Sequence, residues 1–162
     1  MSETPALSGN AKRKMRSASR LYAVQALFQM EHSAQSTEAV TDEFLTHRFG
    51  AEFDDGIEMN EGDVDLFRHL VEEAVNWQAK IDQMTDRALV AKWPIDRIDP
   101  TLRALFRAAG AELLEGDAPP KVVIAEFVDI AHSFYPEGKE PKFVNAVLDH
   151  MAREAKPDAY GS

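Results

Sequence analysis

The chain has 162 residues, of which 44% are hydrophobic and 28% are charged, and its formal net charge is −10. That length and composition are typical of one globular domain. Cysteine is absent, which excludes disulfides, thiolate catalysis and cysteine-ligated metals. No apolar run approaches the ~18 residues of a membrane span, and no signal-peptide core follows the basic N-terminus, so we expect a cytoplasmic protein that does not contact the membrane.

Positive charge is concentrated near the N-terminus. No acidic residue occurs between Glu3 and Glu31, and five basic residues lie within nine positions of that interval: Lys12, Arg13, Lys14, Arg16 and Arg20. The chain from Glu31 onward has 13 basic residues against 27 acidic ones, a charge of −14. An acidic protein that gathers its cations at one end favours a polyanionic partner. The alternative is a solvated basic arm without a partner.

Residues 1–9 are polar and are predicted to form a disordered lead-in. From Asn10, which we expect to be the N-cap, apolar residues recur at helical spacing as far as Phe28. The basic cluster falls in the first turns of this helix, where the helix dipole already leaves partial positive charge. Cations cost stability there, so their placement favours a bound anion.

A second helix is predicted over residues 37–48, with Ser36 as its cap, followed by an acidic, glycine-punctuated loop over residues 50–62. From Asp63 the helical period continues to about residue 90. That length indicates either one long helix or two helices joined near Gln78.

The Trp93-Pro94 step ends this helical segment, because proline disfavours the helical conformation of the residue before it. Asp99 and Pro100 then provide the strongest helix start in the chain, a capping carboxylate followed by proline at the first helical position. This helix should end at Gly116.

Two further helices are predicted to begin at Pro119-Pro120 and at Pro141, although residues 122–124 (VVI) taken alone could form a strand. The tail over residues 154–162 is expected to be frayed. The pattern predicts a compact all-α bundle of six to seven helices, with residues 10–153 forming one domain.

Residues that could support catalysis are not arranged for it. The five histidines never pair at helix-face spacing, and no glycine-rich phosphate loop or nucleophile elbow occurs. Neighbouring carboxylates are adjacent in sequence, so they diverge on a helix. We therefore expect no catalytic residue, metal or cofactor, and we interpret the chain as a binding module rather than an enzyme.

Four segments resemble one known family. They are residues 20–29 (RLYAVQALFQ), 99–114 (DPTLRALFRAAGAELL), 120–126 (PKVVIAE) and 141–149 (PKFVNAVLD). Their order and content are similar to those of the bacterial transcription antitermination factor NusB family, and the resemblance spans about residues 10–152. The KFVN-x-VLD segment is the most specific of the four.

The resemblance implies an all-helical fold of two small helical bundles and a non-enzymatic role in transcription antitermination. It implies binding to boxA-type single-stranded RNA of nascent ribosomal RNA, together with the small-subunit ribosomal protein NusE. The protein would recruit NusE to elongating RNA polymerase and would meet other antitermination factors indirectly.

The resemblance also assigns roles to residues of this chain. The RNA-binding residues would be Lys12, Arg13, Lys14, Arg16, Arg20, Gln25, Lys142, Phe143 and Asn145. The residues that contact the partner protein would be Leu102, Arg103 and Phe106. We expect Arg16 and Arg20 to be exposed. The chain departs from the family pattern at Ser17 and Ala18, which interrupt its arginine run, and at Ala88, where an aromatic residue is expected.

Physical chemistry supports this assignment but leaves alternatives open. Lysine and arginine neutralise phosphates, and Phe143 could stack on an unpaired base or pack in the core beside Val147. Lys142 and Asn145 could equally be solvated or capping residues. At the level of function, the same fold could be the RNA-recognition domain of a truncated rRNA cytosine methyltransferase. It could also be a protein–protein scaffold, such as a homodimer that hides the basic face.

Overall fold

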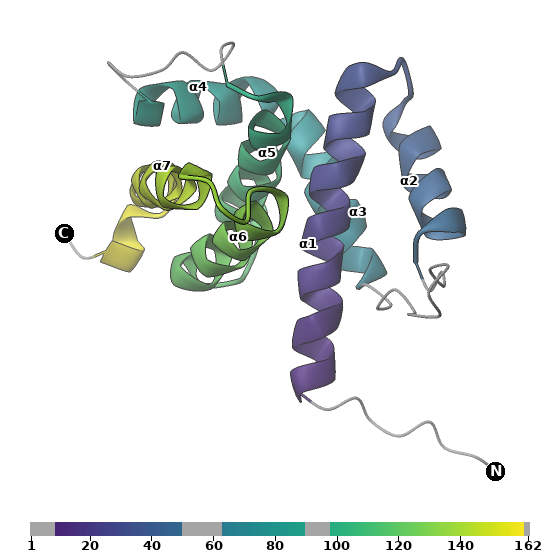
Figure 1. Cartoon of the computed structure of the whole chain (residues 1–162), viewed down its shortest axis with the longest axis horizontal. Helices are drawn as coiled ribbons and strands as arrows, with labels where there is room; N and C mark the ends of the chain where they lie inside the picture. Colours follow the sequence, from purple (N-terminus) through teal and green to yellow (C-terminus); the bar gives the residue numbers. More distant parts are fainter. Residues whose placement is uncertain (1–8, 50–62, 90–97, 161–162) are drawn as a thin grey trace.

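The computed structural model describes residues 9–49, 63–89 and 98–160, and the regular structure within these ranges is helical (Figure 1). This confirms the predicted all-α fold. The α-helices are α1 (Gly9–His32), α2 (Thr37–His47), α3 (Val64–Asn76), α4 (Gln78–Leu89), α5 (Pro100–Glu115), α6 (Pro120–Phe134) and α7 (Glu140–Ala155), and the 3-10 helix η2 (Pro157–Tyr160) follows them.

Three helices, α2, α3 and α5, begin where the sequence supplies a capping side chain. Ser36, Asp63 and Asp99 each accept a hydrogen bond from a backbone N–H in the turn that follows, at 3.1, 2.9 and 2.7 Å. Each side chain thereby satisfies one of the donors that a helix N-terminus leaves unpaired. The predicted starts of α2, α3 and α5 are confirmed for this reason.

Two boundaries differ from the prediction, at Asn10 and in the C-terminal tail. Asn10 is not a cap, because α1 already includes Gly9. The long segment from Asp63 is two helices, α3 and α4, which meet at Trp77 and Gln78, so the second of the two predicted alternatives is confirmed. Residues 154–160 are not a frayed tail: α7 continues to Ala155 and η2 follows it. The predicted features at residues 1–8, 50–62 and 93–94 lie outside the described residues.

The helices form two bundles that share one central helix (Figure 1). Helices α1, α2 and α3 pack together, and α4, α6 and α7 gather on the other side of α5. Ten of the sixteen residues of α5 are buried, which is typical of a helix surrounded by neighbours. Close packing is visible at Gly110, where an added Cβ would lie 2.5 Å from Ile81 Cγ2.

The most unusual part of this core is a buried ion pair. The side chains of Arg20 on α1 and Glu112 on α5 are only 2% and 1% exposed. Arg20 donates to both oxygens of Glu112, from Nε at 2.7 Å and from Nη2 at 2.8 Å. Its Nη1 lies 3.1 Å from Oε1 of Glu126 on α6. One guanidinium therefore links three helices from the two bundles.

The surrounding carboxylates keep Arg20 charged. Burial alone lowers the pKa of Arg20, but the hydrogen bond and charge of Glu112, followed by the charges of Glu126 and Asp63, raise that pKa above its ordinary value. The Arg20 guanidinium therefore stays protonated in the folded chain.

Replacing Arg20 with Ala should lower the free energy of unfolding by about 3–5 kcal/mol, because the Glu112 carboxylate would be left buried without a partner. Urea denaturation followed by circular dichroism measures this loss. The double variant Arg20→Met/Glu112→Leu should recover most of it, since it removes both charges and keeps apolar volume. A single variant as stable as wild type would contradict a role for this ion pair in the core.

Candidate nucleic-acid interface

The first turns of α1 present three basic side chains to solvent. Lys12, Arg13 and Lys14 are exposed, and no carboxylate of the described residues lies within ion-pair distance of them. Arg16 keeps 42% of its side chain exposed and stands 4.0 Å from Oδ2 of Asp63. These four residues are called the α1 basic cluster below. Unpaired, exposed cations are the groups that can neutralise phosphates.

Arg20 does not belong to that cluster. The prediction that Arg20 is exposed is wrong, because its guanidinium is enclosed by α5 and α6 and its charge is matched by Glu112 and Glu126. A phosphate could reach it only by displacing those carboxylates. Its role is to fix the rotation of α1, which leaves the α1 basic cluster directed away from the core.

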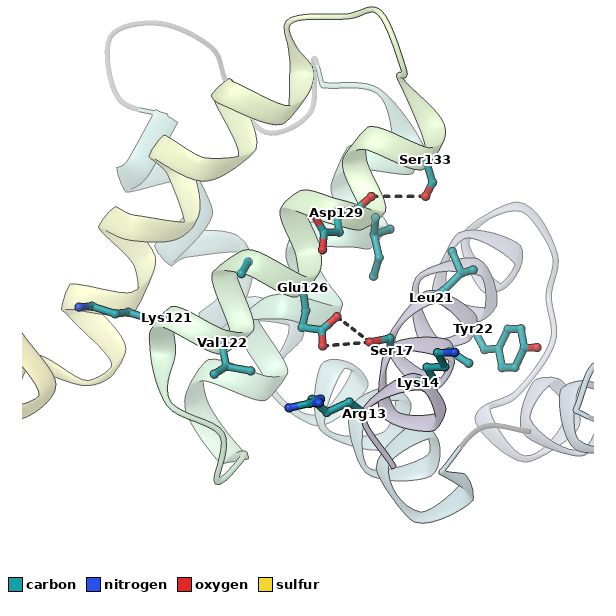
Figure 2. A pocket seen from close by; sticks show the side chains of 13 residues that line it. Arg13, Lys14, Ser17, Leu21, Tyr22, Lys121, Val122, Glu126, Asp129 and Ser133 are labelled. Atoms are coloured by element: carbon teal, nitrogen blue, oxygen red, sulfur yellow. Dashed lines mark hydrogen bonds between the residues drawn. The ribbon is translucent and has the colours of Figure 1, made fainter. Parts of the chain in front are cut away.

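An open groove of about 840 Å³ runs between the N-terminal half of α1 and α6, and Figure 2 shows the side chains that line it. We call it the α1–α6 groove. Arg13 and Lys14 contribute from α1, and Lys121 contributes from the first turn of α6. Carboxylates of Glu126 and Asp129 lie on the same α6 wall. The groove therefore carries both signs of charge.

The break in the arginine run has a structural cause. Ser17 faces α6 and donates its hydroxyl to the Glu126 carboxylate, at 2.9 Å from Oε1 and 2.8 Å from Oε2 (Figure 2). Ala18 is partly buried against the core. Both positions line the α1–α6 groove, where small side chains allow α6 to approach. Upstream of these two residues, Lys12, Arg13 and Lys14 occupy solvent-facing positions of α1.

The predicted RNA residues of α7 divide into two kinds. Lys142 and Asn145 are exposed, whereas Phe143 is half-buried. The Phe143 ring packs edge-on against Phe106 of α5, with ring centroids 6.2 Å apart and planes at 70°. Both roles considered for Phe143 therefore remain open to it, since part of the ring is packed and part is accessible.

Lys121 connects the two regions predicted to bind RNA. A shallower groove of about 400 Å³ between α6 and α7 is lined by Asn145 and by Lys121. Since Lys121 also lines the α1–α6 groove, it stands between the α1 basic cluster and Asn145. Sequence reasoning missed Lys121: an exposed lysine after Pro120 is visible in the sequence, but its nearness to α1 is not.

Gln25 lies elsewhere. It lines a separate groove of about 460 Å³ bounded by α1, α2, α5 and α6, which we call the α1–α2 groove. Its Oε1 is buried and accepts no hydrogen bond from the described residues. The structure thus separates Gln25 from the α1 basic cluster, although both are on one helix.

Two of the three residues expected to contact a partner protein are in the core. Leu102 is 6% exposed and Phe106 is fully buried, because α5 is enclosed by the other helices. The prediction that these side chains form a docking face is therefore wrong for the free chain. Arg103 keeps 15% of its side chain exposed and forms an ion pair with Glu31, with Nε donating to Oε1 at 2.6 Å.

An exposed aromatic residue nearby was also missed. Phe28 is 36% exposed and lines the α1–α2 groove together with Thr101 of α5. Its ring stacks on His32 one turn later, with centroids 4.3 Å apart. In the sequence Phe28 is one of the regularly spaced apolar residues of α1. Nothing in the sequence distinguishes it from the buried members of that stripe, so its exposure was not predicted.

The described residues offer neither a metal-binding cluster nor a membrane-spanning helix. No three histidine or carboxylate side chains of the described residues gather closely enough to hold a metal ion. Among the described helices, none has the length and apolar character needed to cross a membrane.

Comparisons with known proteins identify the family. The NusB family model matches residues 17–153. The transcription antitermination protein NusB of Maricaulis maris is 46% identical over 148 residues, covering 91% of each chain. The corresponding protein of Granulibacter bethesdensis is 44% identical over 157 residues, covering 93% of this chain and 95% of its own.

Solved structures share the fold. T. maritima NusB superposes with a TM-score of 0.67 at 26% identity, covering 99% of this chain and 100% of its own. A chain from a complex of antitermination factors NusB and NusE with dsRNA gives the same TM-score at 22% identity, covering 91% and 99%. These matches confirm the resemblance seen in the sequence, and this chain therefore belongs to the NusB family of transcription antitermination proteins, a non-enzymatic family.

Proposed function

We propose that this chain binds boxA-type single-stranded RNA in nascent ribosomal RNA together with the ribosomal protein NusE, and recruits NusE to elongating RNA polymerase in the cytoplasm. One observation carries the RNA-binding part of the proposal. In the α1 basic cluster, Lys12, Arg13 and Lys14 are exposed beside an open groove and form no ion pair with the described residues, in a chain whose net charge is −10. Long-range repulsion by the rest of the chain would restrict a polyanion to this end of α1.

The relatives support the antitermination role over the methyltransferase alternative. The match extends over 91% and 95% of the length of two transcription antitermination proteins. A fold relative has been crystallised with NusE and dsRNA, which supports NusE and an RNA as partners but does not bear on the single-stranded form of that RNA.

The partner protein requires a surface other than Leu102 and Phe106. We place it on the α1–α2 groove and the adjoining Arg103–Glu31 ion pair, because exposed Phe28 gives this face an aromatic anchor. Aromatic and arginine side chains supply a large share of binding energy at protein interfaces. This face and the α1 basic cluster occupy opposite ends of α1, so RNA and NusE could bind together.

RNA affinity should depend steeply on salt. If the four side chains of the α1 basic cluster each neutralise one phosphate, log K against log salt should have a slope of about −3, from about −0.7 per contact on single strands. The variant Arg13→Ala/Lys14→Ala should reduce that slope to about −1.5 and weaken binding, with an unchanged unfolding midpoint because both side chains are exposed. Fluorescence anisotropy with boxA RNA at several salt concentrations measures both quantities.

Lys80→Ala on α4 is the matched control for these exposed cations, since Lys80 lies over the Trp77 ring away from α1. It should leave the slope unchanged. A wild-type slope near zero would remove the electrostatic basis of the proposal.

Phe143→Ala should reduce RNA affinity by about 1–3 kcal/mol if the accessible part of the ring stacks on a base. Because the ring also packs on Phe106, the variant should be less stable, yet by less than the ~3–5 kcal/mol typical of a fully buried phenylalanine. Anisotropy and urea denaturation separate the two effects. A folded variant with wild-type RNA affinity would exclude Phe143 from the site.

Phe28→Ala should weaken NusE binding by at least about 2 kcal/mol, as for an aromatic anchor, while RNA binding by the free chain is retained. Isothermal titration calorimetry with purified NusE measures the loss. Val75→Ala on α3 is the control, because Val75 is similarly exposed at 39% but lies away from this groove. Equal effects of the two variants would refute the placement of NusE on this face.

A further inference from the structure

Some basic residues of the described ranges form ion pairs with carboxylates, and others do not. Arg87, Arg107 and Arg153 each form an ion pair with a carboxylate, and so they are neutralised within the fold. Lys121 has no carboxylate of the described residues within ion-pair distance, and it is exposed. It is among the residues that line the α1–α6 groove from the α6 wall, while Arg13 lines it from α1, although in Figure 2 the Lys121 ammonium extends away from α1. A strand of RNA that follows the groove would thus meet unpaired cations on both sides.

The surface between these cations is suited to a base rather than to a phosphate. Leu21 of α1 and Val122 and Ile130 of α6 provide apolar side chains against which an aromatic ring can pack. The volume of about 840 Å³ lies within the range of pockets that hold small organic ligands. That volume is large enough for one unpaired nucleotide.

Two carboxylates line the same groove and differ in availability. Glu126 already accepts a hydrogen bond from the Ser17 hydroxyl and forms an ion pair with Arg20. The Asp129 carboxylate is exposed and accepts no hydrogen bond from the described residues. A carboxylate repels phosphate but accepts hydrogen bonds from the amino group of a base, as Asp and Glu do from N4 of cytosine.

We propose that the α1–α6 groove holds one unpaired nucleotide whose base carries an exocyclic amino group. Asp129 accepts a hydrogen bond from that amino group, and Lys121 and Arg13 contact the phosphates on its two sides. This inference rests on the proposed function, because it assumes that the chain binds single-stranded RNA. It adds a base preference and assigns a role in RNA binding to two further residues, Lys121 and Asp129.

Short oligocytidine and oligouridine RNAs test the base contact, since the two bases stack alike but only cytosine has an exocyclic amino group. The wild-type chain should bind oligocytidine about tenfold more tightly than oligouridine. Asp129→Ala should abolish this preference, and it should raise the affinity for oligouridine because a negative charge is removed. Asp42→Ala, an exposed aspartate of α2, should leave the preference intact.

Lys121→Ala should act differently, because a contact with phosphate does not depend on which base the nucleotide carries. It should lower the affinity for both RNAs by the same factor, so that the ratio of the two affinities is unchanged. The slope of log K against log salt should become less steep by about 0.7. Lys80→Ala should change neither the affinities nor the slope. Circular dichroism confirms that each variant is folded.

The outcomes separate this inference from the function on which it rests. If the wild-type chain binds neither RNA at low salt, the proposed RNA-binding function fails. If it binds both equally, or if Asp129→Ala keeps a wild-type preference, the base contact is refuted. If Lys121→Ala matches Lys80→Ala, the phosphate contact on α6 is refuted while RNA binding through the α1 basic cluster stands.

Discussion

The arrangement of this protein depends on the buried contact of Arg20 with Glu112 and Glu126. A buried ion pair contributes little net stability over apolar packing, but either partner alone is costly. The contact therefore specifies which faces of α1, α5 and α6 meet, because any other rotation of α1 would leave a charge buried without its partner. It fixes α5 between the two bundles, and it sets the direction in which the rest of α1 presents its basic residues.

The same contact divides the positive charge of α1 into two functions. Arg20 is neutralised inside the fold, while Lys12, Arg13 and Lys14 stay exposed and form no ion pair with a carboxylate of the described residues. Ser17 lies on the side of α1 that faces α6, where it donates to Glu126 and allows the helices to approach. An arginine at Ser17 would add a second charge beside Arg20, so the position of the basic residues follows from the packing of α1 against α6.

The central position of α5 explains why the two ends of α1 offer different surfaces. Because α5 is enclosed, Leu102 and Phe106 stabilise the core, and the surface near the start of α5 is formed instead by Arg103 and its neighbours on α1. The C-terminal half of α1 contributes the exposed ring of Phe28 to that surface, and the N-terminal half presents the α1 basic cluster. The two ends of α1 therefore offer separate surfaces for the RNA and the protein partner that we propose.

The sequence by itself determined the helices that local chemistry specifies. The caps at Ser36, Asp63 and Asp99 and the proline at position 100 act within one turn, so their helices were predicted at the correct residues. Only the tertiary structure decided which charged and aromatic side chains are accessible. Arg20 and Arg16 look alike in sequence, and Lys121 is far from Arg13 along the chain. Their burial and proximity depend on packing between distant helices, which a local pattern of residues does not encode.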